Sequence, residues 1–157
     1  MKSPIAGVDL TGTGACAAFN LKRASRAVTQ LYDAALTGTG LRSTQFAILV
    51  ATAKSQPVSI GALADITLMD HTTMARNVRV MARDGLIEIP ERGAKREKRV
   101  RLTAKGARAL AKAVPVWRAT QARFVDAVGT GAWRTMQREL EVAAGVARRS
   151  SSSSRDF

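Results

Sequence analysis

Apolar residues recur every three or four positions near the start of the chain. The stretch from about 15 to 36 has a stripe of such residues on one side, and arginine and glutamine on the other. The stripe consists of Ala17, Leu21, Ala24, Val28, Leu31 and Ala35. This spacing predicts a long amphipathic helix, and the TGTG sequence at 37–40 is expected to end it.

Two shorter apolar patterns follow and predict two further helices. Ser43 or Thr44 can cap the first of them, and the turn residues Ser55-Gln56-Pro57 end it. The residues expected to face inward are Phe46, Leu49, Val50 and Ala53. The second pattern, SIGALADI, is a short helix capped by Ser59.

The segment HTTMARNVRVMARDGL predicts a fourth helix, with Asp70 as its cap and Gly85 as its end. Residues 86–89 and 100–102 then have the composition of two short strands. They are separated by PERGAKREKR, so they predict a β-hairpin with a long basic loop.

The rest of the chain predicts two more helices. Thr103 can cap a fifth helix, in which Pro115 is expected to produce a kink or delay the regular start. Glycines at 129 and 131 separate it from a last helix. The apolar stripes of these two helices contain Leu110, Val114, Trp117, Phe124, Val128, Trp133, Met136, Leu140, Ala143 and Ala147.

The predicted fold class is mainly α with a small β-hairpin, in a single domain at 15–148. Within it, residues 43–103 form a compact unit, and the flanking helices at 15–36 and 104–148 carry more apolar surface than that unit can cover. A second copy of the chain is the usual cover for such helices, which predicts a homodimer. Residues 1–14 are expected to be flexible, and the serine-rich tail at 149–157 to be disordered.

Length and composition narrow the class of protein. The chain has 157 residues, 46% of them hydrophobic, which fits a globular domain with a working core. No apolar run reaches the length of a membrane span and no signal peptide is evident, so a cytoplasmic protein is expected. Cys16 is the only cysteine, so an intrachain disulfide is excluded.

Net charge is the outlying property of the composition. Lysine and arginine total 25 against 12 acidic residues, which gives a formal charge of +13. A chain this basic attracts polyanions, of which nucleic acid is the commonest in the cytoplasm. A basic surface can also serve a membrane or solubility, so the distribution of the charge matters more than its total.

The fourth predicted helix concentrates part of this charge on one side. On a helical wheel, Met74, Val78 and Met81 fall in one narrow sector, and the opposite sector is polar and basic. That sector contains Thr72, Arg76, Arg79 and Arg83, with His71, Thr73 and Asn77 beside it. For an isolated helix, a solvated surface is the more common reason for such a row.

The neighbours of this helix favour a function in binding DNA. A short helix precedes it across a tight connection, as in a helix-turn-helix. Small hydrogen-bonding residues occupy its first turn, where they can approach bases and phosphates. The basic hairpin follows directly. A helix suited to the major groove beside a hairpin suited to the minor groove predicts a winged helix.

At this point the sequence resembles a known family. The segments TQFAILVATA, SIGALADI, DHTTMARNVRVMARDGLIE and VRLTAKG, with CAAFNLKRASRAVTQLYD before them, are similar to the MarR family of bacterial transcriptional regulators. The resemblance spans about residues 15–148. Its most specific part is the fourth helix with D-G-L-I, a basic wing and L-T-x-x-G. It implies a homodimeric winged helix-turn-helix protein that binds a pseudo-palindromic operator on double-stranded DNA.

The resemblance also implies roles for particular residues. In the recognition helix, the residues expected near bases are His71, Thr72, Thr73, Arg76 and Asn77, and those nearer phosphates are Arg79 and Arg83. Ser59 would contact a phosphate from the preceding helix. In the wing, Arg92, Lys95 and Arg96 would reach the minor groove or the backbone.

The wing departs from the family pattern at one position. Members commonly have an aspartate before paired arginines, where it ties down the hairpin. Here Ala94 stands ahead of Lys95-Arg96. The wing of this chain is therefore expected to be looser, or to be anchored through Glu91 or Glu97.

Two modes of sensing are open. Family members often respond to small aromatic compounds in a cleft, for which the candidates here are Phe19, Asn20, Arg23 and Phe46. Helix-spaced aromatic residues more often pack in a core or an interface. Other members sense oxidants through a cysteine near the first helix, as Cys16 is, but their cysteine is held by tyrosines at a different spacing from Tyr32. A helical cysteine among alanines is more often a small packed residue.

Enzyme classes fit the sequence poorly. One histidine and one cysteine lie far apart, so no metal site is predicted, and no cofactor motif appears. The leading hypothesis is a dimeric, sequence-specific transcriptional repressor released by a ligand. The rivals are a non-specific architectural DNA-binding protein, a redox-sensing regulator, and an adaptor that keeps the fold without binding DNA.

Overall fold

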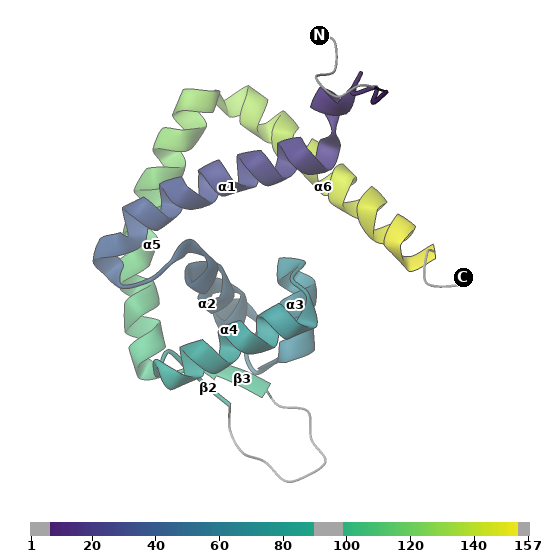
Figure 1. Cartoon of the computed structure of the whole chain (residues 1–157). Helices are drawn as coiled ribbons and strands as arrows, with labels where there is room; N and C mark the ends of the chain where they lie inside the picture. The colour runs from purple at the N-terminus through teal and green to yellow at the C-terminus, as the bar shows by residue number, and fades with distance from the viewer. Residues whose placement is uncertain (1–6, 90–98, 154–157) are drawn as a thin grey trace. The chain divides into compact units, whose positions relative to one another are not determined.

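The computed structural model describes residues 7–89 and 99–153, with side chains through residue 150. The chain divides into two compact units, Met1–Val116 and Trp117–Phe157. The division lies inside one helix, between Val116 and Trp117. It therefore falls beyond the end of the expected winged-helix part at 43–103, within the segment expected to form the dimerisation helices (Figure 1).

The first unit begins with a short 3-10 helix, η1 (Thr13–Ala15), followed by the long helix α1 (Ala17–Leu36). The expected N-terminal helix is confirmed, and η1 was not predicted from the sequence. A second 3-10 turn, η2 (Thr37–Thr39), ends at Gly40, which has a φ of 78°. The TGTG sequence therefore ends α1 as predicted, because glycine adopts this left-handed conformation without strain.

Helix α2 spans Ser43–Ser55, so both Ser43 and Thr44 lie inside its first turn. The prediction that one of them caps this helix is therefore wrong. Arg42 occupies the cap position, and its amide donates to Gln45 Oε1 at 3.0 Å. The amide of Ser43 donates to Asp33 Oδ1 at 2.6 Å. The free amides of α2 are therefore bound by a glutamine of its first turn and by an aspartate of α1.

The caps predicted for the next two helices are confirmed. Helix α3 (Ile60–Thr67) begins after Ser59, whose hydroxyl oxygen accepts from the amide of Ala62 at 3.0 Å. Helix α4 (His71–Arg83) begins after Asp70, whose Oδ1 accepts from the amide of Thr73 at 2.7 Å. Both bonds satisfy amides that have no partner inside a helix.

The hairpin strands are β2 (Ile87–Glu88) and β3 (Arg99–Leu102), and they pair antiparallel, with Ile87 opposite Leu102. A third strand, β1 (Val58–Ser59), pairs with the other edge of β3 and places Val58 opposite Val100. The sheet order is therefore β1-β3-β2. The hairpin was predicted, but β1 was not.

The core of the first unit lies between α2, α3, α4 and the sheet. Met74, Val78 and Met81 of α4 are at most 1% exposed. The other fully buried large side chains of the described chain include Leu36, Ile48, Leu49, Leu63, Ile87 and Val100. The apolar sector predicted for α4 is therefore its packed side.

Helix α5 (Ala104–Val128) starts after Thr103, whose hydroxyl oxygen accepts from the amide of Gly106 at 2.9 Å, as expected of a cap. The helix contains Pro115 and begins at Ala104. Its regular start is therefore not delayed by the proline.

The second unit contains the end of α5 and helix α6 (Thr130–Ser153). Gly129, with a φ of 90°, separates the two helices as predicted. The rings of Phe124 and Trp133 pack edge to face across this turn, with centroids 5.6 Å apart. The last helix extends past its expected end at 148, so residues 149–153, predicted to be disordered, are helical; 154–157 lie outside the described residues.

The predicted fold class is confirmed: the described chain is mainly helical with a small antiparallel sheet. Over the described residues, none of the helices combines the length and the apolar character that a membrane span requires.

Candidate nucleic-acid interface

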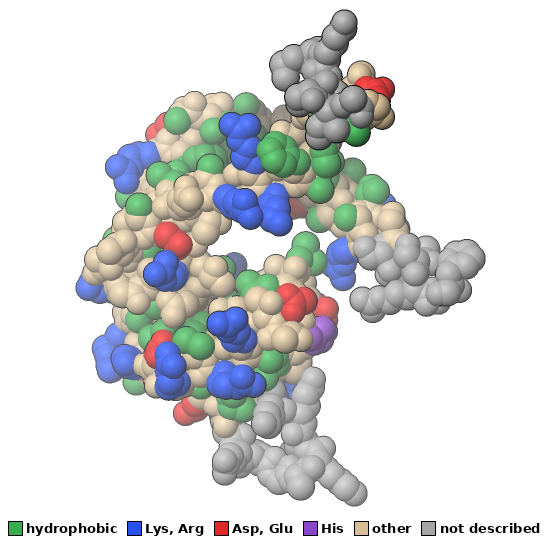
Figure 2. Space-filling view, viewed as in Figure 1, with side chains coloured by type: hydrophobic (Ala, Val, Ile, Leu, Met, Phe, Trp, Pro, Cys, Tyr) green, Lys and Arg blue, Asp and Glu red, His purple; other side chains and the backbone are tan. Residues whose placement is uncertain are grey.

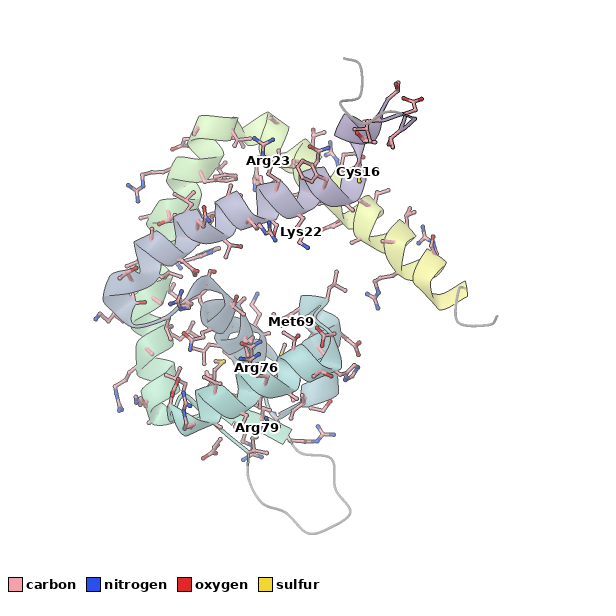
Figure 3. All side chains as sticks on the ribbon, in the orientation of Figure 1. Cys16, Lys22, Arg23, Met69, Arg76 and Arg79 are labelled. Carbon is pink, nitrogen blue, oxygen red and sulfur yellow. The ribbon has the colours of Figure 1, made fainter. Side chains whose placement is uncertain are left out.

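Helix α4 separates a packed side from a polar side as its sequence predicts. Thr72, Arg76, Arg79 and Arg83 are all exposed, whereas the methionines and Val78 on the opposite side are buried. Figure 2 shows basic side chains on the surface that carries α4, and Figure 3 shows Arg76 and Arg79 projecting from this helix. The helix therefore presents a row of cations to solvent.

The three arginines of this row differ in their surroundings. Arg83 forms an ion pair with Asp84, with its Nε 3.4 Å from Oδ1. In the part of the chain that the structure describes, neither Arg76 nor Arg79 has an acidic partner. These two guanidinium groups are therefore the ones available to an external anion.

An acidic residue, Asp70, caps the start of α4. The hydrogen bond from Thr73 to Asp70 lowers the pKa of this carboxyl below its ordinary value. Next to it, His71 is exposed and lies against the first turn of α3: a methyl group added at Gly61 would be 3.4 Å from His71 Cε1. The starts of the two helices of the helix-turn-helix thus lie close together.

Asn77 lies at the edge of the polar side and is half-buried. Its amide nitrogen donates to the carbonyl of Thr73 at 3.0 Å and faces the sulfur of Met69 at 3.7 Å. The amide oxygen is therefore the atom of Asn77 most available to a base. The sequence indicated the position of this side chain but not these contacts.

Ser59 is half-buried at the start of α3. Its oxygen accepts from Ala62, so the hydroxyl hydrogen stays free to be donated. This is the atom that could bind a phosphate at the expected position.

The wing residues predicted to bind DNA, Arg92, Lys95 and Arg96, lie outside the described residues, as do Glu91, Ala94 and Glu97. Strand β3 adds two exposed arginines that the site prediction missed, Arg99 and Arg101. They flank the buried Val100, and this alternation of basic and apolar residues was the signal that could have found them.

The four residues suggested for an effector cleft have different environments. Phe46 is 7% exposed in the core, whereas Phe19 is 61% exposed on α1. The amide of Asn20 donates to the carbonyls of Gly14 and Cys16, and Arg23 is exposed. Phe46 thus packs in the core, which was the alternative to a role in an effector cleft.

Cys16 is a free, exposed thiol at the start of α1, and Figure 3 shows it at the opposite end of the helix from α2. Tyr32 is sixteen residues further along. At a rise of 1.5 Å per residue this is roughly 24 Å, too far for the tyrosine to contact the thiol.

A short helix, a tight turn, a helix with an exposed cationic row and an antiparallel hairpin define a winged helix-turn-helix protein. Residues 39–97 match the sequence model of the MarR family. The Mycobacterium tuberculosis transcriptional regulator MosR, solved in complex with DNA, is 39% identical in sequence to the chain. The match covers 85% of the chain and 97% of MosR, with a TM-score of 0.78. The chain therefore belongs to the MarR family of transcriptional regulators.

Two more distant structures share the fold. PcaV, a transcriptional regulator from Streptomyces coelicolor solved with its natural ligand, is 19% identical, with coverage of 91% and 99% and a TM-score of 0.76. The transcriptional repressor CouR bound to a 23-mer DNA duplex is 17% identical, with coverage of 87% and 98% and a TM-score of 0.75. A search of curated protein sequences gave no match.

Proposed function

We propose that the protein is a homodimeric transcriptional repressor that binds a pseudo-palindromic operator and releases it when a small aromatic effector binds. The observation that carries this proposal is the exposed row on α4, in which Arg76 and Arg79 have no acidic partner among the described residues. Guanidinium groups bind phosphates and the O6 and N7 atoms of guanine. The DNA complex of MosR supports the same use of the fold.

In this proposal the first turn of α4 reads bases. Thr72 and Arg76 point outward from the N-terminal half of the helix, and Arg79 and Arg83 follow toward phosphates. His71, Thr73 and Asn77 border the same turn. Ser59 and the wing residues Arg92, Lys95 and Arg96 would fix the position of the protein on the DNA backbone.

Exposed apolar side chains on the outer helices support a dimer. Of the eleven large hydrophobic side chains that are exposed in the described chain, seven lie on α1 and α6. They are Phe19, Leu21, Leu31, Met136, Leu140, Val142 and Val146. A second copy of the chain would remove such surface from water. Two-fold symmetry then requires half-sites whose centres are roughly 34–36 Å apart.

Release by an effector has support from relatives, since PcaV was solved with its natural ligand. On this chain, the exposed Phe19 and Arg23 of α1 are the candidates that remain for contact with an aromatic acid. A panel of benzoate and cinnamate derivatives, added to the protein–DNA complex, tests this part. Release by none of them would remove the effector from the proposal.

The DNA-binding test uses a duplex selected by the wild-type protein from a random pool. We expect Arg76→Ala to weaken binding to this duplex by about 1–3 kcal/mol, as for loss of a guanidinium contact to a base. Arg123→Ala is the matched control, because Arg123 is also exposed but belongs to α5. Equal losses in the two variants would contradict the role of α4.

The same selected duplex separates the proposal from a non-specific architectural protein. Unrelated DNA is added as competitor at rising salt. A sequence-specific regulator keeps its preference for the selected duplex, whereas an architectural protein loses binding to both alike. Failure to bind either duplex would favour the adaptor alternative.

The dimer is tested by mass in solution. The chain has a mass of 16.7 kDa, so a dimer of about 33 kDa is expected (2 × 16.7). Leu140→Glu, in α6, should shift this mass toward the single chain, because a charge would enter the apolar interface. Ile66→Glu is the control, since Ile66 is also exposed but lies on α3. A single-chain mass for the wild-type protein would refute the dimer.

A further inference from the structure

The C-terminal end of the recognition helix is held by the first turn of α5. Lys105 Nζ donates to the carbonyl of Asp84 at 2.7 Å, and its aliphatic stem passes over Gly85. The Thr103 hydroxyl lies 2.7 Å from the carbonyl of Gly85, to which it donates, and the Thr103 amide donates to that of Leu86 at 3.2 Å. Figure 1 shows α5 beginning beside the end of α4.

The lysine bond falls on the carbonyl of Asp84, the C-cap residue of α4, and the two threonine bonds fall on the next two carbonyls. The last carbonyls of a helix lack amide partners within it and carry partial negative charge. A lysine donating there is favourable on both counts. Since Lys105 of α5 and the residue directly before α5 supply the donors, the direction in which α4 ends is tied to the start of α5.

We propose that Lys105 is a positioning residue for DNA recognition: it holds the C-terminal end of α4 and so sets the direction of its arginine row, without contacting DNA. This inference rests on the proposed function of α4. It deepens that proposal by assigning Lys105 an indirect role that charge alone would not reveal.

The alternative for an exposed lysine in a DNA-binding protein is a direct phosphate contact. The two roles differ in their salt dependence. A lysine that neutralises a phosphate contributes about 0.9 to the slope of log K against log salt. A lysine that acts through α4 changes affinity for the selected sequence and leaves this slope unchanged.

The experiment compares Lys105→Met with Lys112→Met. Both lysines are exposed on α5 and donate to a backbone carbonyl, but Lys112 bonds to Gly38 at 2.9 Å, on the turn after α1. The two variants therefore lose the same charge and the same kind of bond. Only Lys105→Met loosens α4. Lys105→Arg is the conservative variant, because arginine can donate to the same carbonyl.

Binding is measured on the selected duplex and on unrelated DNA over a range of salt. We expect Lys105→Met to bind the selected duplex about 3- to 10-fold more weakly, the range for loss of one hydrogen bond. Its affinity for unrelated DNA and its salt slope should match those of Lys112→Met. Lys105→Arg should keep most of the affinity for the selected duplex that Lys105→Met loses.

A second measurement needs no DNA. The amides of Gly85 and Leu86 donate back into α4, to Ala82 and Met81 at 2.9 Å each. Their hydrogen exchange should be faster in Lys105→Met and unchanged in Lys112→Met, because the end of α4 opens more often.

Three results would overturn the proposal. The first is that Lys105→Met loses equal affinity for both duplexes and has a salt slope lower by about 1. The second is that Lys105→Met binds both duplexes as Lys112→Met does. The third is that Lys105→Arg binds the selected duplex as weakly as Lys105→Met. If the wild-type protein does not prefer its selected duplex, the proposed function itself fails. The exchange rates then decide by themselves whether Lys105 holds α4.

Discussion

Replacing Gly106 by alanine tests the close approach of α5 to Leu86, the residue directly before β2. A Cβ at this position would lie only 1.9 Å from the carbonyl oxygen of Leu86. An ordinary contact needs about 3.4 Å, so the two segments would have to separate by 1.5 Å (3.4 − 1.9). The obstacle is backbone, which cannot rotate away as a flexible side chain can.

The size of the effect follows from the bonds that such a movement breaks. Three hydrogen bonds cross this contact: the two from Thr103 and the one from Lys105. At about 1 kcal/mol each, their loss costs about 3 kcal/mol. Alanine returns up to about 1 kcal/mol as the better helix former. The overlap itself adds nothing further, since the movement that relieves it is the one that breaks the bonds. The net loss is about 2 kcal/mol.

Urea unfolding followed by circular dichroism, at equal protein concentrations, measures this loss. Gly131→Ala is the control, because a Cβ there meets nothing within 4 Å. It should be neutral or stabilising by up to about 1 kcal/mol. If Gly106→Ala unfolds at the same urea concentration as Gly131→Ala, the close packing of α5 on Leu86 is refuted.

Three further predictions concern the turn of the helix-turn-helix, its cap and the thiol. Leu68 has a φ of 52°, a left-handed conformation that strains a residue with a side chain, and it is 56% exposed. Leu68→Gly should therefore stabilise the fold by up to about 1 kcal/mol, measured by urea unfolding. A loss of stability in this variant would exclude strain at Leu68. The pKa of the Asp70 carboxyl is lowered because the carboxylate accepts a hydrogen bond from the Thr73 amide. Its contribution to stability is therefore complete above pH 3.8, the ordinary pKa of an aspartate, and is lost as the pH falls through the lowered pKa. Asp70→Asn should flatten the acid side of the stability profile relative to the wild-type protein, and equal profiles for the two proteins would contradict the capping bond. Finally, peroxide should affect DNA binding of the wild-type protein and of Cys16→Ser alike, and release of the wild-type protein alone would favour the redox-sensing alternative.

The elements predicted correctly are those specified by local sequence. Ser59 and Asp70 cap helices that begin directly after them, and Gly85 ends α4 in a left-handed conformation with a φ of 71°. The apolar spacing of α4 was enough to separate its packed side from its basic row. Most of the candidate site lies on this helix, which is why its exposed residues could be named from the sequence.

What the sequence could not predict depends on partners far along the chain. Strand β1 has two residues, and it is a strand because Val58 pairs with Val100, 42 positions later. The start of α2 is fixed by Asp33 of the preceding helix. Lys105 looks like any surface lysine until α5 is placed beside the end of α4.

The two caps of the helix-turn-helix also differ in a way that bears on the proposed function. Asp70 places a full negative charge at the start of α4, which already neutralises the partial positive charge of that end and would repel a phosphate. Ser59 is neutral, so the start of α3 keeps its partial charge and a hydroxyl hydrogen to donate. A duplex that approaches both helices should therefore place a phosphate at Ser59 and base edges at the first turn of α4. A phosphate bound at Asp70 instead, in a DNA complex of this protein, would show that this electrostatic argument is wrong.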